Sequence, residues 1–317
     1  MGSMASPLVL RLGTRGSELA LAQAALAEAA LRAAFPDAVL ERVVIRTSGD
    51  QRPGARLAMD KGIFTRELEQ ALQAGSIDIA VHSLKDLPTE VAPAYRLAGV
   101  LARAAVEDVL VGRAPVPAGL DSLSPGARVA TSSVRRRRMV EACRPDVRVE
   151  EIRGNVPTRL RKLSAPGGPD AVVLARAGLE RLGWDPAAES LVIDGTSLYL
   201  AVLPEELMLP AAGQGAIGLE IRAGDAAAAA AVGAINDGPT WARVRLEREF
   251  LRLLRAGCRT PVGIATRLDG DRLCARAVVF AEDGPGCARG QADGPTAEPE
   301  AVAAALVAAM RGERKKS

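Results

Sequence analysis

The sequence predicts an α/β protein with two α/β domains followed by a small C-terminal α+β domain. The chain has 317 residues, 48% of them hydrophobic, and a single core stops growing at roughly 250 to 300 residues, so two or three domains are expected. Short apolar runs alternate with segments of helical periodicity, as in βαβ units. The alternation restarts after a stretch rich in proline and glycine, residues 115–126, which indicates a second α/β domain.

In the first part of the chain, helical spacing and strand-like runs follow one another closely. Leu19, Leu26 and Ala30 repeat at helical spacing, and Pro36 ends that helix. The mainly apolar run at residues 77–81 is typical of a strand buried in a parallel sheet. The expected strands cover residues 8–12, 39–45 and 77–81, and the expected helices cover residues 18–34 and 64–74.

A second α/β domain is expected to begin near Leu101, and a third, smaller domain follows it. The second domain is expected to have strands at residues 128–130, 147–152 and 171–174 and helices at residues 134–142 and 156–163. A strand at residues 216–221 and an alanine-rich helix at residues 225–235 come next. The remaining pattern is a charged helix at residues 241–255, a strand-rich region at residues 262–290 and a last helix at residues 298–310.

Composition argues against several classes of protein. The formal net charge is only +3, whereas a generic nucleic-acid-binding surface needs a larger basic excess. No run approaches the roughly 18 uncharged apolar residues that span a bilayer, and no secretory signal is recognised, so a cytoplasmic protein is expected. Four cysteines lack CxxC spacing and His82 is the only histidine, so neither a metal site nor a disulfide framework is expected.

The segment GQGAIG, residues 213–218, has the GxGxxG spacing of dinucleotide-binding loops. Such a loop requires a strand before it and a helix after it. Here Pro210 precedes the segment and a strand-like run follows it. We therefore interpret these glycines as a bend where the chain crosses between domains.

Several arginines stand directly after predicted strands, each with a hydroxyl or amide that can begin the next helix. Ligands of open α/β folds bind at the carboxyl ends of strands, and guanidinium groups bind carboxylates bidentately. The sets are Arg15 with Ser17, Arg135 and Arg136 with Thr131, Ser132 and Ser133, and Arg153 and Arg159 with Asn155. They predict a cleft between the α/β domains for a substrate with several carboxylates, although the arginine run at residues 135–138 also fits a solvated basic face.

Two further residues are candidates for chemistry. Asp86 follows the strand at residues 77–81, and an acid among arginines stays ionised and can stabilise a cation. An ion pair with Lys85 is the alternative. Cys258 lies in a loop between Arg255 and Arg259, which favour its thiolate, so it suits a nucleophile or an attachment point, although most single cysteines are small core residues. His82, beside a buried strand, is interpreted as a structural residue.

These residues belong to a series of segments that closely resembles the porphobilinogen deaminase family, whose activity is also called hydroxymethylbilane synthase. The resemblance runs from about Leu8 to the C-terminal helix. Its specificity comes from the combination and the order of the segments. They are LGTRGSELALAQ, DKGIFTRELEQAL, DIAVHSLKDLPTE, ATSSVRRRR, IRGNVPTRLRKL, AGLERLG, LPAAGQGAIGLE and AGCRTPVG.

The resemblance implies a transferase of tetrapyrrole (haem) biosynthesis. Such enzymes join four porphobilinogen units head to tail into hydroxymethylbilane and release ammonia at each step. Their dipyrromethane cofactor is bound through a thioether to a loop cysteine, which here matches Cys258. The matching catalytic acid is Asp86, which would stabilise the cation left when ammonia departs.

The resemblance also implies the domains and the residues that hold the ligand carboxylates. Domains 1 and 2 are expected to have the type II periplasmic-binding-protein fold. Domain 1 would comprise residues 8–101 and 215–235, domain 2 residues 102–210, and domain 3 residues 238–313. The carboxylate-binding set implied is Arg15, Ser17, Lys61, Lys85, Thr131, Ser132, Ser133, Arg135, Arg136, Arg153, Arg159 and Arg181, with Gln23, Phe64, Ser83, Gly154, Asn155 and Gln214 nearby.

The sequence departs from the family pattern at three places, which affect segments expected to move during the reaction. Residues 52–60 form a shortened approach to Lys61, only Arg103 and Asp108 remain of a usual hinge motif, and extra residues occur between Gly183 and Pro210. A monomer that binds porphobilinogen, with no nucleic-acid or membrane partner, is expected. A non-enzymatic module for a dicarboxylate is the competing hypothesis, and a nucleic-acid binder that uses the arginine run is a weaker third.

Overall fold

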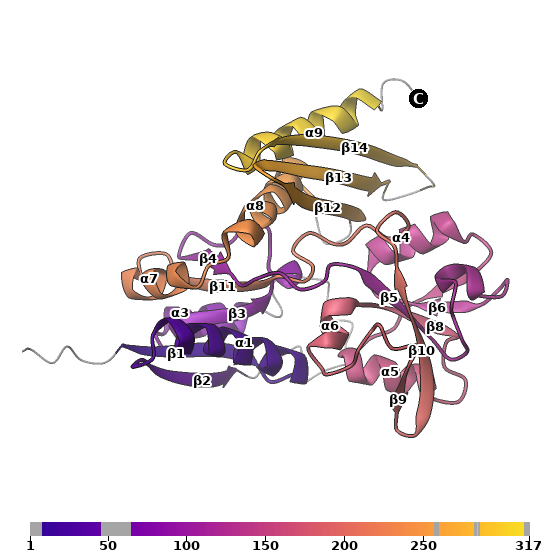
Figure 1. Ribbon diagram of the computed structural model, residues 1–317, viewed down its shortest axis with the longest axis horizontal. Helices are drawn as coiled ribbons and strands as arrows, with labels where there is room; N and C mark the ends of the chain where they lie inside the picture. Colours follow the sequence, from indigo (N-terminus) through magenta and orange to yellow (C-terminus); the bar gives the residue numbers. More distant parts are fainter. Residues whose placement is uncertain (1–7, 46–64, 257–259, 282–283, 285, 314–317) are drawn as a thin grey trace, which may run out of the picture. The chain divides into compact units, whose positions relative to one another are not determined.

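The computed structural model describes residues 8–45, 65–256, 260–281, 284 and 286–313 (Figure 1). The chain forms two compact units. One comprises Met1–Arg103 and Ala216–Trp241, and the other comprises Ala104–Gly215 and Ala242–Ser317. Each unit has its own sheets and its own hydrophobic clusters. The division into three domains stays a prediction.

The first unit contains a mixed five-stranded sheet in the order β2-β1-β3-β11-β4. β1 pairs in parallel with β2 and β3, and β11 runs antiparallel to β3 and β4. β11 comes from much later in the sequence than its neighbours. The strands are β1 (Val9–Arg15), β2 (Val39–Ile45), β3 (Ile79–Ser83), β4 (Tyr95–Val100) and β11 (Ile217–Arg222).

Helices cover both faces of this sheet. On one face, Leu31 of α1 (Glu18–Ala34) and Val232 of α7 (Ala226–Ala234) pack in one cluster with Leu12 of β1. On the other face, Leu68 and Leu72 of α3 (Arg66–Gln73) pack with Ala80 of β3. Because successive side chains of a strand point to opposite faces, β3 contributes to both layers.

The second unit contains a mixed six-stranded sheet in the order β7-β6-β8-β5-β10-β9. β6 pairs in parallel with β7 and β8, whereas β5 runs antiparallel to β8 and β10. The strands are β5 (Asp108–Gly112), β6 (Arg128–Ala130), β7 (Arg148–Glu150), β8 (Ala171–Ala175), β9 (Ser190–Ile193) and β10 (Thr196–Leu203). The helices are α4 (Val134–Cys143), α5 (Val156–Ser164) and α6 (Arg176–Glu180), and the short 3₁₀ helix is η2 (Gly119–Ser122).

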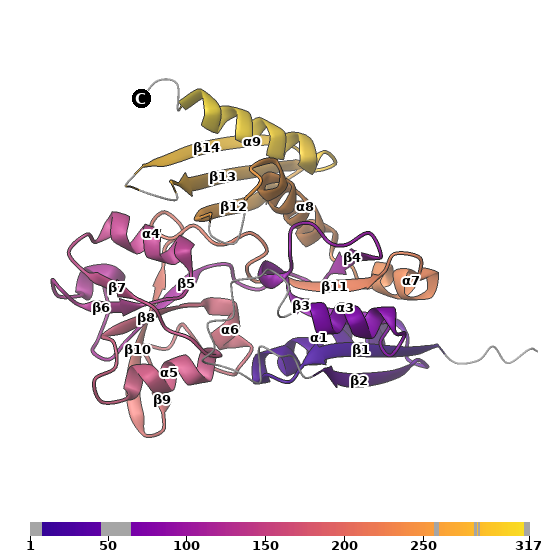
Figure 2. The ribbon, with the colours of Figure 1, turned by 180° about the vertical axis from the view of Figure 1, so that it is seen from behind.

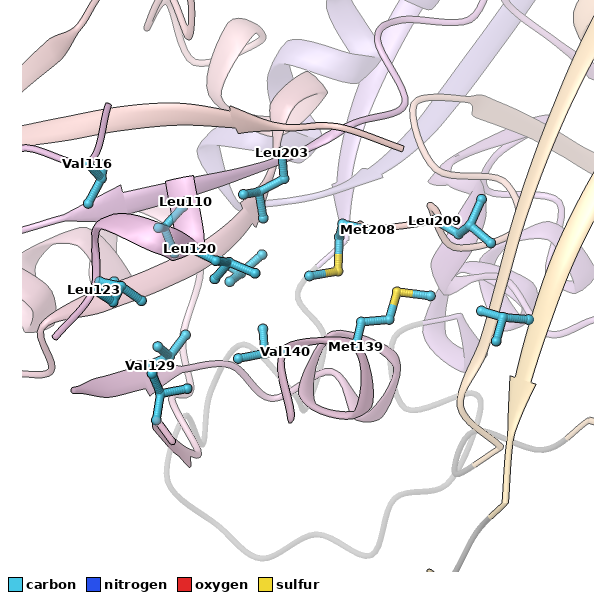
Figure 3. Packing of buried hydrophobic residues seen from close by; sticks show 14 of the residues in the cluster. Leu110, Val116, Leu120, Leu123, Val129, Met139, Val140, Leu203, Met208 and Leu209 are labelled. Atoms are coloured by element: carbon cyan, nitrogen blue, oxygen red, sulfur yellow. The ribbon is translucent and has the colours of Figure 1, made fainter. Parts of the chain in front are cut away.

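The faces of the six-stranded sheet are covered by different helices. Met139 and Val140 of α4 pack with Leu110 and Val129 on one face (Figure 3). On the other face, α5 and α6 pack through Leu160 and neighbouring apolar residues against β5, β8 and β10. This layering is that of an α/β domain with buried strands.

The same unit ends in a three-stranded antiparallel sheet with two helices. Its strands are β12 (Val262–Asp269), β13 (Arg272–Phe280) and β14 (Cys287–Pro295), and its helices are α8 (Gly238–Leu253) and α9 (Pro299–Glu313). Figure 2 shows α9 lying along this sheet, where Leu306 and Met310 pack with Phe250 of α8. A Cβ on Gly263 would lie 2.3 Å from Cε of Met139, so β12 and α4 are closely packed.

The two mixed sheets share one strand order. In the first sheet, β2, β1 and β3 are followed by the antiparallel strand β11 and then by β4. In the second sheet, β7, β6 and β8 are followed in the same way by the antiparallel strand β5 and then by β10. β11 is the inserted strand of the first sheet, and β5 is that of the second. This is the arrangement of type II periplasmic binding proteins, and the predicted fold class is confirmed.

Most expected elements occur within two residues of their predicted bounds, and α1, β2 and β6 match them. The sequence analysis missed β4, β5, the hairpin of β9 and β10, and α6. The bend at GQGAIG is confirmed, because Gly213 and Gly215 have φ values of 71° and 82° and β11 follows them. No helix in the described part of the chain is long and apolar enough to cross a bilayer.

Candidate active site

The carboxyl ends of β1 and β3 lie at one edge of the first sheet, because these strands pair in parallel. β1 ends at Arg15, and Ser17 begins α1 by accepting a hydrogen bond from the N–H of Ala20 at 3.3 Å. β3 ends at Ser83, whose hydroxyl donates to Oε1 of Gln23 in α1 at 2.9 Å. The two strand ends are therefore connected through α1.

The predicted catalytic acid stands on a 3₁₀ turn, η1 (Leu84–Asp86), directly after β3. The N–H of Leu84 donates to the carbonyl of Ala216 at 3.1 Å, and the Leu84 side chain is buried. Lys85 and Asp86 are exposed. The turn is thus anchored through its first residue and presents its two charged residues at the end of the strand.

His82 faces the opposite side of the sheet from Ser83. The ring is buried, and its Nε2 lies 2.8 Å from Oε2 of Glu220 in β11, whose side chain has no exposed area. Glu69 of α3 belongs to the same region, because burial and then the charge of Glu220 raise the pKa of Glu69. His82 is a hydrogen-bonded residue of the core, which agrees with its predicted structural role.

In the second unit, α4 and α5 each begin with a side-chain cap. Oγ of Ser133 accepts a hydrogen bond from the N–H of Arg136 at 3.4 Å, and Oδ1 of Asn155 accepts one from the N–H of Thr158 at 2.9 Å. Gly154 has a φ of 120°, and a Cβ there would lie 2.7 Å from Cγ2 of Thr158. Only glycine permits this turn, which precedes the capping residue Asn155 at the start of α5.

Arg135 and Arg136 share one buried carboxylate, that of Asp108 at the start of β5. Nη2 of Arg135 lies 2.8 Å from Oδ2 of Asp108, and Nη2 of Arg136 lies 2.8 Å from Oδ1. Burial alone raises the pKa of Asp108, but the two guanidinium charges outweigh it and lower the pKa to about 2. Asp108 is therefore ionised at neutral pH and faces two cations.

Gln214 and backbone oxygens complete this cluster. Nε2 of Gln214 donates to Oδ1 of Asp108 at 2.9 Å, and its Oε1 accepts from Nη2 of Arg135 at 3.4 Å. Nη1 of Arg135 donates to the carbonyl of Leu209 at 2.6 Å, and Nη1 of Arg136 donates to a backbone carbonyl of β8 at 2.9 Å. Nε of Arg135 is buried and has no hydrogen-bond partner among the described residues. One carboxylate therefore balances only part of the positive charge here.

The other predicted arginines of this unit lie nearer to its surface. Arg153 is exposed, and Nε of Arg159 donates to the carbonyl of Gly154 at 2.7 Å. Nη2 of Arg181 donates to the carbonyl of Gly215 at 2.6 Å, and burial lowers the pKa of Arg181. Hydrogen bonds to backbone oxygens fix Arg159 and Arg181 in defined orientations, whereas Nε of Arg153 donates to Oε1 of Glu151 at 2.7 Å.

The described residues of the predicted site fall into one set per unit. In the first unit, the ends of β1 and β3 and the segments directly after them carry Arg15, Ser17, Ser83, Lys85 and Asp86, and Gln23 lies in α1. In the second unit, the segments that follow β6 and β7 carry Thr131, Ser132, Ser133, Arg135, Arg136, Arg153, Gly154, Asn155 and Arg159, while Arg181 ends α6 and Gln214 joins the cluster at Asp108. Lys61, Phe64 and Cys258 lie outside the described residues.

Sequence reasoning did not assign roles to Asp108 and Glu220. Both are acids within apolar runs, at the start of VLVG and within AIGLEI, and buried acids occur almost only with partners. An acid within an apolar run was therefore the sequence signal that could have indicated a buried, paired carboxylate at each position. Among the described residues, no group of three histidine, cysteine or acidic side chains is arranged as a metal site.

The strand order and the residues at the strand ends define the class of this protein. It is an α/β protein with domains like those of type II periplasmic binding proteins, and its strand ends carry groups suited to binding carboxylates. Residues 10–230 match the family model "Porphobilinogen deaminase, dipyromethane cofactor binding domain", and residues 241–312 match "Porphobilinogen deaminase, C-terminal domain". The chain belongs to the porphobilinogen deaminase family.

Two relatives, both named porphobilinogen deaminase, agree with this assignment. The porphobilinogen deaminase of Rubrobacter xylanophilus is 46% identical over 309 residues, which cover 97% of this chain and 94% of the relative. The porphobilinogen deaminase of Desulforudis audaxviator is 44% identical over 297 residues, which cover 93% of this chain and 92% of the relative. Among solved structures, the BvgS periplasmic VFT2 domain of Bordetella pertussis has a TM-score of 0.43 and 16% identity over 72% of this chain and 86% of that one.

Family membership confirms three predictions made from the sequence. The chain is a member of the predicted family, it is a transferase with porphobilinogen deaminase function, and its cofactor is dipyrromethane. The hypothesis of a non-enzymatic binding module is disfavoured accordingly.

Proposed function

We propose that this chain makes hydroxymethylbilane from four porphobilinogen units, with Asp86 as its catalytic acid and Cys258 as the residue that carries the cofactor. The observation that carries the proposal is the match of the two family models to residues 10–230 and 241–312, ranges that contain Asp86 and Cys258. In each addition, the bond between the aminomethyl carbon and nitrogen breaks, ammonia leaves, a carbon–carbon bond to a free ring carbon of the next pyrrole forms, and that ring carbon loses its proton. Positive charge develops on the substrate between these two events.

Asp86 is suited to stabilise that positive charge. It lies at the end of a parallel strand, on a turn whose first residue, Leu84, is hydrogen-bonded to the carbonyl of Ala216, so the backbone that carries its exposed carboxylate is held in place. A carboxylate placed next to the site where positive charge develops stabilises that charge. It can also accept hydrogen bonds from pyrrole N–H groups.

The carboxylates of substrate and product would be bound by the set predicted from the sequence. Every porphobilinogen unit adds an acetate and a propionate, and a buried unpaired charge is costly. The cluster around Asp108 supports this role, because two guanidinium groups there share one carboxylate and a buried Nε of Arg135 has no hydrogen-bond partner among the described residues. Those residues fit a ligand rich in carboxylates such as dipyrromethane, which supplies the primer for chain growth when bound.

Several finer features belong to the same proposal. Cys258 would hold the cofactor through a thioether, in a loop that lies outside the described residues. Domain 1 would comprise residues 8–101 and 215–235, domain 2 residues 102–210 and domain 3 residues 238–313. The enzyme would act as a monomer in the cytoplasm and would bind no nucleic acid.

Two measurements test the proposal. Purified protein incubated with porphobilinogen is expected to release ammonia and to give uroporphyrin after acidification. Its intact mass is expected to exceed that of the polypeptide by two pyrrole units, mapped to the peptide that contains Cys258. A bare polypeptide mass together with porphobilinogen binding but no ammonia would instead identify a binding module.

A further inference from the structure

Two buried polar side chains, His82 and Glu220, meet on the strands β3 and β11, where β3 leads to Asp86. His82 lies on the α3 face of the first sheet, as does Ala80, which packs with α3. In the register of β3 and β11, Ala80 pairs with Glu220 and His82 with Gly218, so Glu220 is the diagonal neighbour of His82. Their hydrogen bond therefore ties β3 to β11 four residues before Asp86.

The sheet is irregular at Glu220. Leu219 pairs with Gly99 of β4 but Glu220 pairs with Leu97, so β4 contains an extra residue at this point. A bulge of this kind changes the direction of neighbouring side chains and often occurs beside active sites. The extra residue is Ala98 of β4, beside the strand that carries Glu220.

The strand β11 also receives the turn itself. A Cβ on Gly218 would lie 2.8 Å from Cδ1 of Leu84, so the absence of a side chain at Gly218 lets the first residue of the turn pack onto β11. The N–H of Leu84 donates to the carbonyl of Ala216 on the same segment. Any shift of β11 relative to β3 is therefore transmitted to Leu84 and to the turn that ends at Asp86.

An apolar pair would serve the core at least as well as this one. Burying charged groups costs free energy that their attraction repays only in part, and buried ion pairs are often replaceable by apolar residues without loss of stability. Oε1 of Glu220 is buried with no hydrogen-bond partner among the described residues, so Glu220 depends on His82. Glu69 of α3 and Tyr95 of β4 also feel the charge of Glu220. Specific geometry, not stability, is the gain from such a pair.

We propose that His82 and Glu220 are positioning residues, whose hydrogen bond fixes β3 against β11 and so sets the place of Asp86. On the opposite face, the bond from Ser83 to Gln23 holds the same strand end against α1. The inference rests on the proposed function, in which Asp86 is the catalytic acid. His82 itself touches neither substrate nor cofactor in this assignment.

The test compares His82→Ala, His82→Gln and the control Leu68→Ala, which removes a core contact between α3 and Ala80 and leaves both members of the pair in place. We expect His82→Ala to lower kcat about tenfold or more with KM for porphobilinogen changed less than about twofold, since misplacement by about 1 Å of a reacting group costs up to about a hundredfold. His82→Gln, whose amide nitrogen can donate to Oε2 of Glu220, is expected to recover most of kcat. All variants should keep the mass of the pyrrole adduct.

Three outcomes would overturn the inference. The first is a loss of kcat in Leu68→Ala equal to that in His82→Ala when the two variants lose the same amount of Tm. The second is a rise in KM without a fall in kcat in His82→Ala. The third is a kcat in His82→Gln that is no higher than in His82→Ala. If His82→Ala does not fold, Glu220→Gln is measured in its place. This variant keeps the side-chain volume but loses the stronger charge-assisted hydrogen bond. A fall in kcat of about threefold supports the inference, and an unchanged kcat overturns it. Absence of turnover in the wild type would contradict the proposed function instead.

Discussion

Asp108 illustrates how one buried carboxylate organises two neighbouring arginines. Arg135 and Arg136 are consecutive on α4, yet both guanidinium groups reach the same acid, through its two different oxygens. Gln214 supplies a third contact. The two arginines therefore have fixed directions, which a run of four arginines on a solvated face would lack. The alternative of a wholly solvated basic face does not hold for these two residues, which are 4% and 5% exposed.

Replacing this carboxylate by an amide is expected to be costly. Asp108→Asn would leave two buried guanidinium groups without their counterion, and breaking a buried pair costs about 3–5 kcal/mol. Urea unfolding of wild type and variant measures the difference. Asp146→Asn is the control, because Asp146 pairs with Arg144 at the surface, where solvent screens the pair and a smaller loss of stability is expected. Equal losses in the two variants would contradict the organising role of Asp108.

Asp86→Asn is expected to separate chemistry from folding. The side chain is exposed, so its change to an amide should leave Tm and the mass of the pyrrole adduct unaltered. Turnover of porphobilinogen should fall by roughly 100- to 1,000-fold, since a preorganised group that stabilises transition-state charge contributes on that order. Steady-state ammonia release measures it. A rate near that of the wild type would refute the assignment of Asp86 as the catalytic acid.

Cys258→Ala is expected to yield a folded protein without the pyrrole adduct and without turnover. The reason is that a thioether needs a sulfur atom, and alanine has none. Intact mass spectrometry measures the adduct. Cys143→Ala and Cys287→Ala are matched controls, because both thiols are exposed and lie outside the predicted site. An adduct that persists in Cys258→Ala would move the attachment to another residue.

At the scale of elements, local signals were sufficient wherever a helix or strand makes its contacts close in sequence. α1 was predicted to its terminal residues, because Ser17 caps it and Pro36 follows it. β4 and β5 were missed, since each is a short run that begins with a polar residue, Tyr95 or Asp108, and depends on strands distant in sequence for its pairing. The hairpin of β9 and β10 was not predicted from the sequence either.

A recognisable signal was present for that hairpin. Asp194 and Gly195 form its two-residue loop, since Ile193 pairs with Thr196, and both loop residues have positive φ, 47° and 80°. Asp-Gly between apolar runs is the strongest short-range indication of such a turn. The extra residues between Gly183 and Pro210 thus extend the edge of the six-stranded sheet.

The cap of α5 gives a prediction for this scale. Asn155→Ala removes the acceptor for the N–H of Thr158, and loss of such a cap costs about 1 kcal/mol. The Tm should fall accordingly. Asn155→Asp keeps an acceptor and places a negative charge at the positive helix start, so this control should retain stability. A larger loss in Asn155→Asp than in Asn155→Ala would contradict the capping role.

For the whole molecule, buried carboxylates make stability depend on pH. The pKa of Asp108 falls to about 2. For Asp78, burial raises the pKa, but hydrogen bonds from Arg11 and Arg222 outweigh it, so the pKa is lowered. A carboxyl whose pKa is lower in the folded state stabilises the protein above its unfolded pKa, near 3.8, and this contribution is lost as the pH falls through the folded value.

We therefore expect the free energy of unfolding to decrease progressively from about pH 4 toward pH 2, after little change from these two groups between pH 5 and pH 7. Urea midpoints measured at fixed pH values test the expectation. Asp78→Asn should show a smaller decrease over the same range, since one of the two titrating groups is absent. A midpoint that stays constant from pH 7 to pH 2.5 would show that neither carboxyl contributes.

The sequence by itself determined the type and order of most elements, the arginine-bearing strand ends and the family. Periodicity, caps and motif order are local properties, readable within a few neighbouring residues. Only the tertiary structure decided that Asp108 lies between Arg135 and Arg136, and that Glu220 meets His82 across 138 positions of sequence. The physical reason is that a buried charge is paired wherever the folded sheet brings a partner, and no local pattern specifies which distant strand that will be.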